Sequence, residues 1–394
     1  MNNTHEIEGR KALLGFVGDV LVDRDNPAET FEPVREILAV PDILSGNLEG
    51  VYSDDPHQAP SVGISISPGT QNLNVFSEVG FDVMSMANNH IADLGHAAML
   101  ETRKQLNAQG VATCGAGETL AAARAPAILD VGGLRVAYLS YASVFPCGYE
   151  ARFNVPGLAP VRAYNLYHES LPNYNTPGAL PRIQTVPDET DLANLREDIA
   201  SARAAADIVV GSFHWGDYAR PIHLTDHELD TARMCAEEGM DIVIGHHHHI
   251  LRGMEWHAGK PIFYGLGHFV FDIRAEFSEV FKSIWDHDPE DPDFYGMGPR
   301  KGWPLLPFHA ESRMTALAWV DISGGSVNDA GFLPCMLNPD GQVRPVAPDS
   351  PEGRKIVDYV RRGCEAHDLN ARLETEEAVT LASHPTVRLA PARP

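Results

Sequence analysis

The sequence predicts an α/β fold, and three features of the chain support this prediction. Short apolar runs alternate with amphipathic stretches between Leu13 and Asp272, as strands and helices alternate in α/β proteins. Polar residues and histidines repeatedly follow the carboxyl end of an apolar run, where open α/β sheets place their ligands. A chain of 394 residues that is 44% hydrophobic is also long enough to bury a large core.

The predicted strands are short apolar runs, each followed by a turn or a polar cluster. They cover residues 13–17, 43–46, 81–86, 134–141, 206–210, 241–245 and 260–264. The predicted helices show apolar residues at helical spacing and cover residues 31–40, 96–109, 191–205 and 225–238. Two antiparallel strands, 314–320 and 331–336, and a helix from about 351 to 367 complete the chain.

Two long segments interrupt this alternation, at about 145–190 and 275–312. Loops of this length in a compact domain are functional covers or disordered segments, and their aromatic content favours ordered covers over a site. Decoration of the surface is the alternative. We predict a single catalytic domain over residues 1–394 with these two insertions and a C-terminal extension from about 314.

Composition limits the partners of the protein. The formal net charge of -24 disfavours binding to nucleic acid or to an anionic bilayer through overall charge. No window approaches the roughly 18 apolar residues that a membrane span requires. We therefore expect a small-molecule or peptide substrate, no nucleic acid and no membrane insertion, and we leave open whether the chain forms a homo-oligomer.

Two features predict a cytoplasmic protein. The five cysteines are odd in number and show no CxxC spacing, which fits a reducing compartment better than a disulfide framework. The first ten residues are polar and do not have the basic flank and apolar stretch of a secretory signal.

Four consecutive histidines, His246 to His249, end the apolar run that begins at Asp241. The run is internal, so it is not a terminal tag. Neutral imidazoles are good ligands for manganese, iron, zinc or nickel. Residues two apart in an extended segment point to the same side, so we expect His247 and His249 to converge.

Further polar residues follow other predicted strands, and the whole set has the chemistry of a metal site. Each residue alone has an ordinary explanation as a helix cap, a turn residue or a buried histidine. Together they form a mixed oxygen and nitrogen set suited to two divalent ions about 4 Å apart, and manganese is the ion we favour. The predicted ligands are Asp19, Glu49, Asn89, His214, His247 and His249. His90 follows Asn89 directly and is predicted to transfer protons.

The ordered motifs of this set carry a resemblance. They are Gly18-Asp19, Asn47-Leu48-Glu49, Ala87-Asn88-Asn89-His90, His214-Trp215-Gly216 and Gly245-His246-His247-x-His249. This set resembles the CapA family of poly-γ-glutamate capsule biosynthesis proteins, which is similar in fold to the calcineurin-like metallophosphatases. The resemblance implies a four-layer α/β/β/α sandwich with a dinuclear centre at one edge. It also implies that the six predicted ligands hold the metals and that His90 protonates a leaving group.

The chain departs from the family pattern at three places. His248 stands where the family usually has proline, and His268 stands where it has asparagine. We predict His268 as a second acid or base opposite His90, with a hydrogen-bonded supporting role as the alternative. The Asp-x-His of true phosphatases is missing, because Asp19 is followed by Val20 and Leu21. One metal would then have one ligand fewer or bind more weakly.

The leading functional hypothesis is a metal-dependent hydrolase for an amide, peptide or ester bond of a carboxylate-bearing, glutamyl-like substrate. Arg220 and Arg300, with Lys301 beside it, are the predicted clamps for that carboxylate, with surface solvation as the alternative. The runner-up is a metal-dependent peptide Cα epimerase that uses His90 and His268 as opposed bases. A non-catalytic accessory of polyglutamate synthesis and a phosphoesterase remain as further hypotheses.

Overall fold

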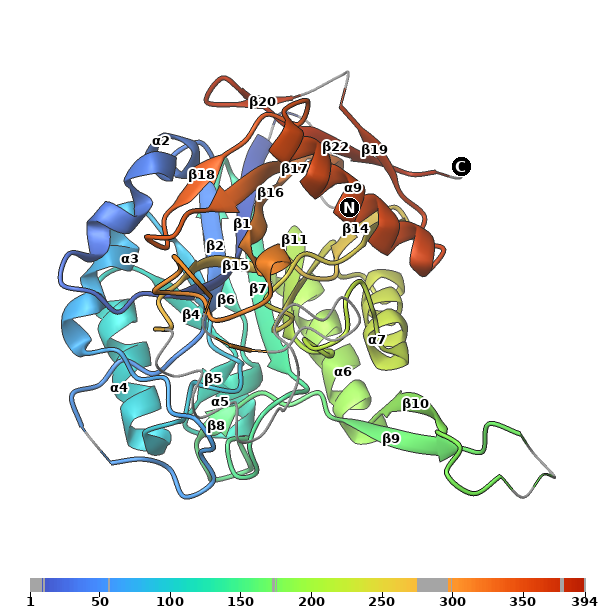
Figure 1. Ribbon diagram of the computed structural model, residues 1–394. Coiled ribbons are helices and arrows are strands. Elements are labelled where there is room, and N and C mark those ends of the chain that lie inside the picture. Colours follow the sequence, from blue (N-terminus) through green and yellow to red (C-terminus); the bar gives the residue numbers. More distant parts are fainter. Residues whose placement is uncertain are drawn as a thin grey trace, which may run out of the picture.

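The structure is a computed structural model that describes residues 9, 11–55, 57–171, 174, 176–274, 297–298, 300–375 and 379–392. Two β-sheets occupy its centre, and helices cover their outer faces (Figure 1).

In the described part of the chain, the larger sheet has ten strands in the order β19-β22-β17-β16-β1-β2-β3-β4, with β15 beside β1 and β18 beside β17. Strand β1 is parallel to β2 and β15 and antiparallel to β16, so the sheet is mixed. The strands are β1 (Lys11–Leu21), β2 (Ile43–Leu48), β3 (Val83–Ser85), β4 (Ala112–Cys114), β15 (His268–Phe271), β16 (Met314–Ser323), β17 (Ser326–Leu337), β18 (Val343–Pro345), β19 (Arg372–Glu374) and β22 (Val387–Ala390).

The smaller sheet has the order β13-β14-β12-β11-β7-β6. Its middle strands are parallel, and β6 and β13 are antiparallel to their neighbours. The strands are β6 (Ala127–Val131), β7 (Leu134–Ala142), β11 (Ile208–His214), β12 (Ile242–His246), β13 (Met254–His257) and β14 (Lys260–Phe263). The predicted alternation of strands and helices is therefore confirmed. The sequence prediction missed short strands such as β4, β13 and β15.

The two sheets pack face to face. Ser85 of the larger sheet lies within hydrogen-bond distance of Ser140 and Ser212 of the smaller sheet, with Oγ···Oγ distances of 2.6 and 2.9 Å. A buried core shared by both sheets surrounds these contacts, with Phe16 on one side and Val210 on the other. Burial of such apolar surface is the main force that holds the sheets together.

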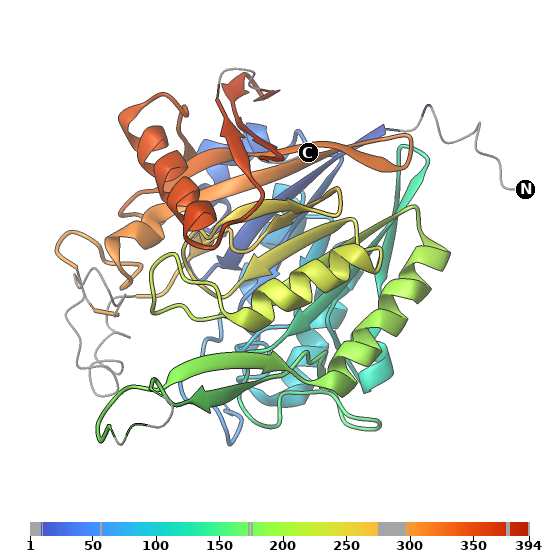
Figure 2. The ribbon, with the colours of Figure 1, turned by 90° about the vertical axis from the view of Figure 1, so that its right-hand side faces the viewer.

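Helices form the two outer layers. On the larger sheet, α3 (Asn74–Val79), α4 (Gly95–Ala108) and the 3₁₀ helix η1 (Pro27–Val34) share a second core with the outer face of the strands. On the smaller sheet, α6 (Glu189–Ala205) and α7 (Asp226–Glu237) pack against β7, β11 and β12 (Figure 2). The four-layer α/β/β/α sandwich is thus confirmed.

Other elements lie at the ends of the sandwich. Helix α9 (Pro351–Ala366) contacts β17 and β13, close to its predicted bounds. The predicted helix-like segment at 31–40 is helical over 31–38, because the end of η1 continues into the α-helical turn α2 (Arg35–Leu38). The remaining short elements are α5 (Leu120–Arg124), η2 (Thr70–Asn72), η4 (Ala310–Arg313), β5 (Ala116–Gly117), β8 (Gly157–Leu158), β20 (Thr380–Leu381) and β21 (His384–Pro385).

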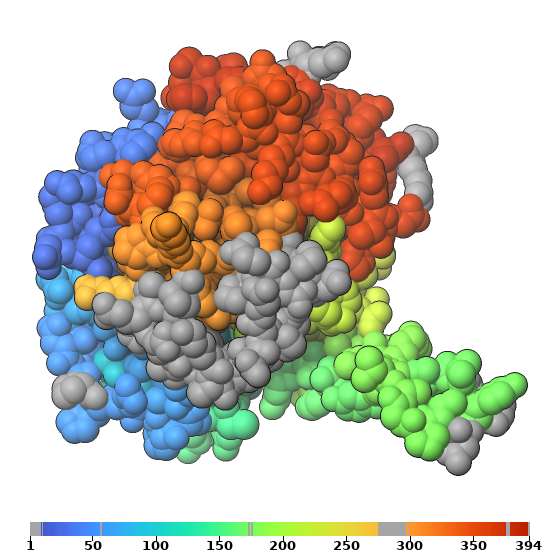
Figure 3. Space-filling view, viewed as in Figure 1, coloured from blue at the N-terminus to red at the C-terminus, as the bar shows by residue number. Residues whose placement is uncertain are grey.

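The first insertion forms an arm as well as a cover. Strands β9 (Ala163–His168) and β10 (Arg182–Pro187) pair as a hairpin that stands away from the body of the molecule (Figure 3). It exposes apolar side chains such as Tyr167 and Ile183, at 66% and 47%. The predicted cover is therefore wrong for this part, because strands of a hairpin pair with each other and need not pack on the site. In the second insertion, residues 275–296 and 299 lie outside the described residues.

The described residues contain no helix that is both long enough and apolar enough to span a membrane.

Candidate metal centre

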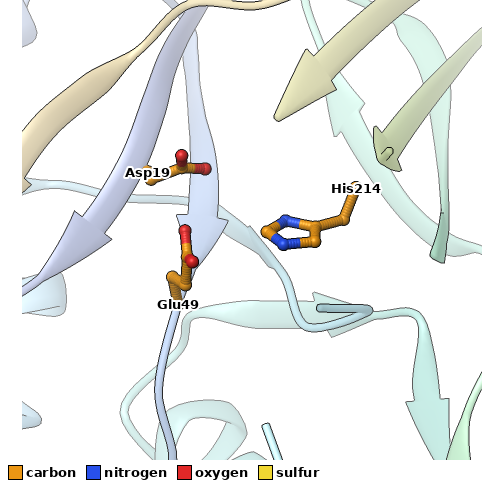
Figure 4. A group of neighbouring side chains, drawn as sticks. All are labelled: Asp19, Glu49 and His214. Atoms are coloured by element: carbon orange, nitrogen blue, oxygen red, sulfur yellow. The ribbon is translucent and has the colours of Figure 1, made fainter. Parts of the chain in front are cut away.

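The ends of strands from both sheets meet at one edge of the sandwich. Asp19 lies near the end of β1, Glu49 follows β2, and His214 ends β11. All three side chains are buried, and one ligand atom from each lies within 4.8 Å of the others. They point toward one another from different strands, as Figure 4 shows. This group could hold a metal ion.

Neighbouring side chains extend the group on both sides. His249 Nδ1 lies 3.3 Å from Asp19 Oδ2, and its Nε2 atom lies 3.6 Å from Glu49 Oε1. On the other side, His214 Nε2 lies 2.7 Å from Asn89 Oδ1 and 3.1 Å from His247 Nδ1. The structure therefore places all six predicted ligands in one continuous cluster.

The cluster leaves buried ligand atoms without hydrogen bonds. Asp19 Oδ2, both carboxylate oxygens of Glu49 and His249 Nδ1 have no hydrogen-bond partner among the described residues. Buried polar atoms are normally paired, because an unpaired buried group costs about 1–3 kcal/mol. Oxygen and imidazole nitrogen together suit divalent transition ions. The donor set therefore fits a metal ion.

Burial and neighbouring charges shift the pKa values of the cluster residues. Burial raises the pKa of Glu49 well above its ordinary value, and the Asp19 charge raises it further. Burial also favours a neutral Asp19, but His246 and His249 outweigh it and hold its pKa well below the ordinary value. Burial lowers the pKa of His214 far below 6.5 and that of His247 to about 3. Neutral histidines are the form that binds a metal.

The histidine loop reaches the cluster through an unusual backbone. Strand β12 ends at His246, and His247 and His249 both have positive φ angles, 89° and 58°. Left-handed conformations of residues other than glycine are uncommon and concentrate at functional sites. The two imidazoles do converge, but the expected reason was wrong: the left-handed turns direct them, and the alternation of an extended strand does not.

A glycine lets β1 reach the same place. A Cβ atom on Gly18 would lie 1.8 Å from the Gly267 carbonyl oxygen, which accepts a hydrogen bond from the Asp19 backbone N–H at 2.9 Å. Only glycine allows this close approach. The glycine of the Gly18-Asp19 motif therefore serves to position the metal-site carboxylate.

His90 lies at the cavity side of the cluster and is held by a carboxylate. Its Nδ1 atom lies 2.9 Å from Asp93 Oδ2, and its Nε2 atom lies 3.0 Å from Asn89 Nδ2. The buried Asp93 also accepts hydrogen bonds from the Tyr149 hydroxyl at 2.9 Å and from the Ile66 backbone N–H at 2.7 Å. A fixed carboxylate of this kind orients a histidine and selects its tautomer.

A cavity of about 380 Å³ opens beside the cluster. Four of the predicted site residues, Asn89, His90, His247 and His249, line it, together with apolar residues that include Phe145 and Phe308. Part of each predicted insertion therefore contributes to the cavity, as expected of a cover. Asn89, His247 and His249 of the cluster therefore share one cavity with His90, and its volume is in the range of small-molecule sites.

Six predicted site residues do not line this cavity: Asp19, Glu49 and His214 lie in the cluster beside it, and His268, Arg220 and Arg300 lie elsewhere. His268 begins β15 and is fully buried, with its ring stacked 4.4 Å from that of His249 and 4.2 Å from that of Phe271. Arg220 pairs with Asp217 at 2.7 Å, and Arg300 donates a hydrogen bond to the Phe308 carbonyl. None of them is among the residues that line the cavity.

The structure thus corrects the predictions that His268 opposes His90 and that Arg220 and Arg300 clamp a carboxylate. The physical reason is the path of the chain. The parallel pairing of β15 with β1 sets His268 beside Asp19, behind His249, and local partners engage the two arginines.

Sequence reasoning also missed several supporting residues. Asn47 Nδ2 donates to Asp19 Oδ1 at 2.9 Å and lies 3.4 Å from His214 Nδ1, while His246 Nδ1 lies 3.3 Å from Asp19 Oδ1. The spacing of Asn47 two residues before Glu49 was a usable signal. The pairing of His246 was not readable, because it depends on how the two sheets face each other.

A buried histidine–carboxylate hydrogen bond anchors the middle of the histidine loop. His248 Nε2 lies 2.7 Å from Glu228 Oε1, and both side chains are inaccessible to solvent. Glu228 belongs to the capping box of α7 and also accepts hydrogen bonds from Thr225. Burial would raise the pKa of Glu228, but His248 lowers it to about 2. The pair ties the strained loop to a helix on the smaller sheet.

Replacing His248 by alanine is expected to destabilise the protein by about 3–5 kcal/mol, because Oε1 of the buried Glu228 carboxylate loses its hydrogen-bond partner. Urea unfolding measures this change. His257→Ala is the matched control, because His257 pairs with Glu237 at the same 2.7 Å but the two side chains are 29% and 62% exposed. That control should cost no more than about 1 kcal/mol. Equal losses in the two variants would contradict an anchoring role.

Acid should destabilise the metal-free protein. Burial lowers the pKa of His214, His247, His248 and His268 below 6.5, so the unfolded chain binds more protons than the folded chain as the pH falls below 6.5. Each histidine contributes a slope of up to about 1.4 kcal/mol per pH unit in this window. Glu49, Asp23 and Asp82, whose pKa values are raised, act oppositely, but His223, His227 and His367, whose pKa values are also lowered, act in the same direction as these four histidines.

Urea midpoints in EDTA at pH 7.5, 6.5 and 5.5 test this prediction. We expect a midpoint that falls between pH 6.5 and 5.5, and a midpoint that stays constant or rises would contradict neutral burial of the histidines.

Comparison with known proteins places this site in a family. A family model described as "Bacterial capsule synthesis protein PGA_cap" matches residues 13–273, more than half of the chain and all of the metal cluster. The chain belongs to this family. The predicted resemblance to CapA proteins is thereby confirmed.

Individual PGA_cap relatives are similar over part of their length. The "PGA biosynthesis protein CapA" of Bacillus subtilis (strain 168) is 30% identical over 269 residues, which are 65% of this chain and 62% of that protein. The "Probable polyglutamine synthesis accessory protein Rv0574c" of Mycobacterium tuberculosis (strain ATCC 25618 / H37Rv) is 27% identical over 63% of this chain and 62% of that protein. The chain therefore matches less than two thirds of the length of these relatives.

Two solved structures give weaker likenesses. A hypothetical protein from Thermus thermophilus aligns over 82% of this chain and 98% of its own, with 12% identity and a TM-score of 0.44. "GAP50 the anchor in the inner membrane complex of Plasmodium" aligns over 89% and 94%, with 8% identity and a TM-score of 0.32.

Proposed function

We propose that this PGA_cap protein is a divalent-metal-dependent hydrolase of an amide, peptide or ester bond, with two manganese ions at the cluster. The observation that carries the proposal is the set of buried ligand atoms without hydrogen bonds on Asp19, Glu49 and His249, beside a cavity that His90 also lines. We propose that it acts in the cytoplasm, and the five free cysteines support a reducing compartment.

The cluster residues have two proposed roles: holding the ions and orienting the ligands. Asp19, Glu49 and His214, together with Asn89, His247 and His249, would hold the ions. Bound divalent ions supply Lewis acidity for a carbonyl oxygen and make water acidic enough to ionise near neutral pH. Asn47 and His246 orient Asp19, so the carboxylate keeps its position when no ion is bound.

His90 supplies the proton for the leaving group. Asp93 accepts from Nδ1, and Nε2, which lies 3.0 Å from Asn89 Nδ2, is the atom that would exchange a proton; the ring lies on the cavity wall with 14% of its side chain exposed. General acid catalysis by a group held in this way contributes typically 10²- to 10⁴-fold.

A role in polyglutamate synthesis is the second proposal. It is supported by the names of the PGA_cap relatives, two of which are described as biosynthesis and accessory proteins. The epimerase hypothesis has less support, because it needs a second base at the substrate and His268 is buried behind His249.

Product analysis on manganese-loaded protein tests these alternatives. We expect release of nitrophenol from 4-nitrophenyl 4-phenylbutyrate and of nitroaniline from the matching anilide. Release from 4-nitrophenyl phosphate alone would indicate a phosphoesterase instead. Incorporation of solvent deuterium into a peptide without cleavage would indicate an epimerase, and no turnover with bound metal would favour the accessory role.

A further inference from the structure

The cavity beside the metal cluster has one chemically polar side and one apolar side. The polar side consists of the site residues and Asp93. The apolar side begins directly at the cluster, because the rings of Phe271 and Phe308 each lie 5.0 Å from the ring of His249. Further along the lining are Ile64, Ile66, Val144 and Phe145. A group bound next to the reacting bond would therefore contact hydrocarbon.

The described lining lacks a cationic lysine or arginine side chain that could pair with a carboxylate. Lysine and arginine are not among the described residues that line the cavity. Asp93, whose oxygens already accept from His90, Tyr149 and Ile66, adds a carboxylate to the wall. On the apolar side, away from the cluster, an anionic group would lose its hydration without gaining a counter-charge from a described side chain, which is unfavourable.

The overall charge of the protein also disfavours an anionic substrate. The formal net charge of -24 repels an anionic polymer at long range. The cavity volume of about 380 Å³ suits one side chain or acyl group with the carbonyl beside it.

We propose that the substrate carries an aliphatic or aromatic group next to the reacting carbonyl, bound in this cavity, in place of the carboxylate that the sequence suggested. The inference rests on the proposed hydrolase function and names its substrate class. Burial of such a group strengthens binding by about 10- to 100-fold.

Two hydroxamates of similar length test the preference. Hydroxamates bind divalent metals, so titration calorimetry on manganese-loaded protein can compare 4-phenylbutanehydroxamate with glutaric acid monohydroxamate without turnover. We expect the phenyl compound to bind at least 10-fold more tightly. Equal binding, or tighter binding of the carboxylate compound, would overturn the proposal even if the protein proves to be a hydrolase.

Substitutions inside and outside the cavity test where the phenyl group binds. Val144→Asp places a carboxylate on the cavity wall and should weaken binding of the phenyl compound at least about fivefold. Ile128→Asp is the matched control, because Ile128 is an apolar residue of β6, 38% exposed and outside the cavity lining, and should leave binding unchanged. A phenyl preference that survives Val144→Asp would place the apolar group elsewhere and overturn the proposal.

A metal-free measurement separates this inference from the hydrolase proposal. We use 4-phenylbutyramide, which has no chelating group, and detect its binding by saturation-transfer NMR in EDTA. Binding that Val144→Asp abolishes and Ile128→Asp retains would support the apolar site even if manganese failed to bind. If the amide does not bind and the hydroxamates show no preference, the inference is wrong whether or not metal is present.

Discussion

Glu49→Gln is expected to remove most of the bound metal and to leave the metal-free protein as stable as the parent. Burial and the Asp19 charge raise the pKa of Glu49, so the metal-free cluster favours the uncharged carboxyl, which glutamine copies in shape and charge. A metal needs the deprotonated carboxylate. We therefore expect manganese affinity to fall at least about 100-fold, beyond the 10- to 100-fold typical of residues that only support a ligand.

Manganese titration and thermal unfolding measure the two effects. In the parent, saturating manganese should raise the melting temperature because it binds only the folded state, and this rise should disappear in Glu49→Gln. Glu150→Gln is the control, because Glu150 is 15% exposed and pairs with Arg152 outside the cluster. Unchanged manganese affinity in Glu49→Gln would exclude Glu49 as a ligand.

His90→Gln is expected to keep the metal and to lose turnover. His90 contacts Asp93 and Asn89 and is placed here as the proton carrier, so its loss should lower the hydrolysis rate of 4-nitrophenyl 4-phenylbutyrate by about 10²- to 10⁴-fold. Metal content per chain should stay at the parental value. Steady-state kinetics and elemental analysis on the same preparation measure both.

Two further variants sharpen this prediction. Asp93→Asn keeps the size of the carboxylate but cannot hold the same tautomer of His90, so it should also lower the rate and should change its pH profile. His96→Ala is the control, because His96 bonds to the Gly148 carbonyl at 2.9 Å and does not line the cavity. Full activity in His90→Gln would remove His90 from the mechanism.

The edge of the sheets that carries the cluster was predictable from sequence because strand ends are local features. Asp19, Glu49 and His214 each lie at or near the carboxyl end of an apolar run, and parallel strands bring such ends to one edge. Convergence of His247 and His249 was predicted for the wrong reason. A left-handed backbone at histidine has no sequence signature, since glycine or asparagine is the usual residue there.

The roles of residues that depend on long-range packing could not be predicted from the sequence. His268 also comes shortly after an apolar run in the sequence, but the register of β15 against β1 buries it behind His249. Arg220 sits close to His214 along the chain, but Asp217 engages it. Glu228, the partner of His248, is separated from it by 20 residues and lies on a different element.

Elemental analysis of untagged protein, as purified and after incubation with manganese and desalting, tests the metal centre most directly. The cluster of six ligands predicts about two ions per chain after incubation. One ion would contradict the dinuclear centre and limit binding to one side of the cluster. Absence of metal in both samples would contradict the metalloenzyme account and favour the accessory role.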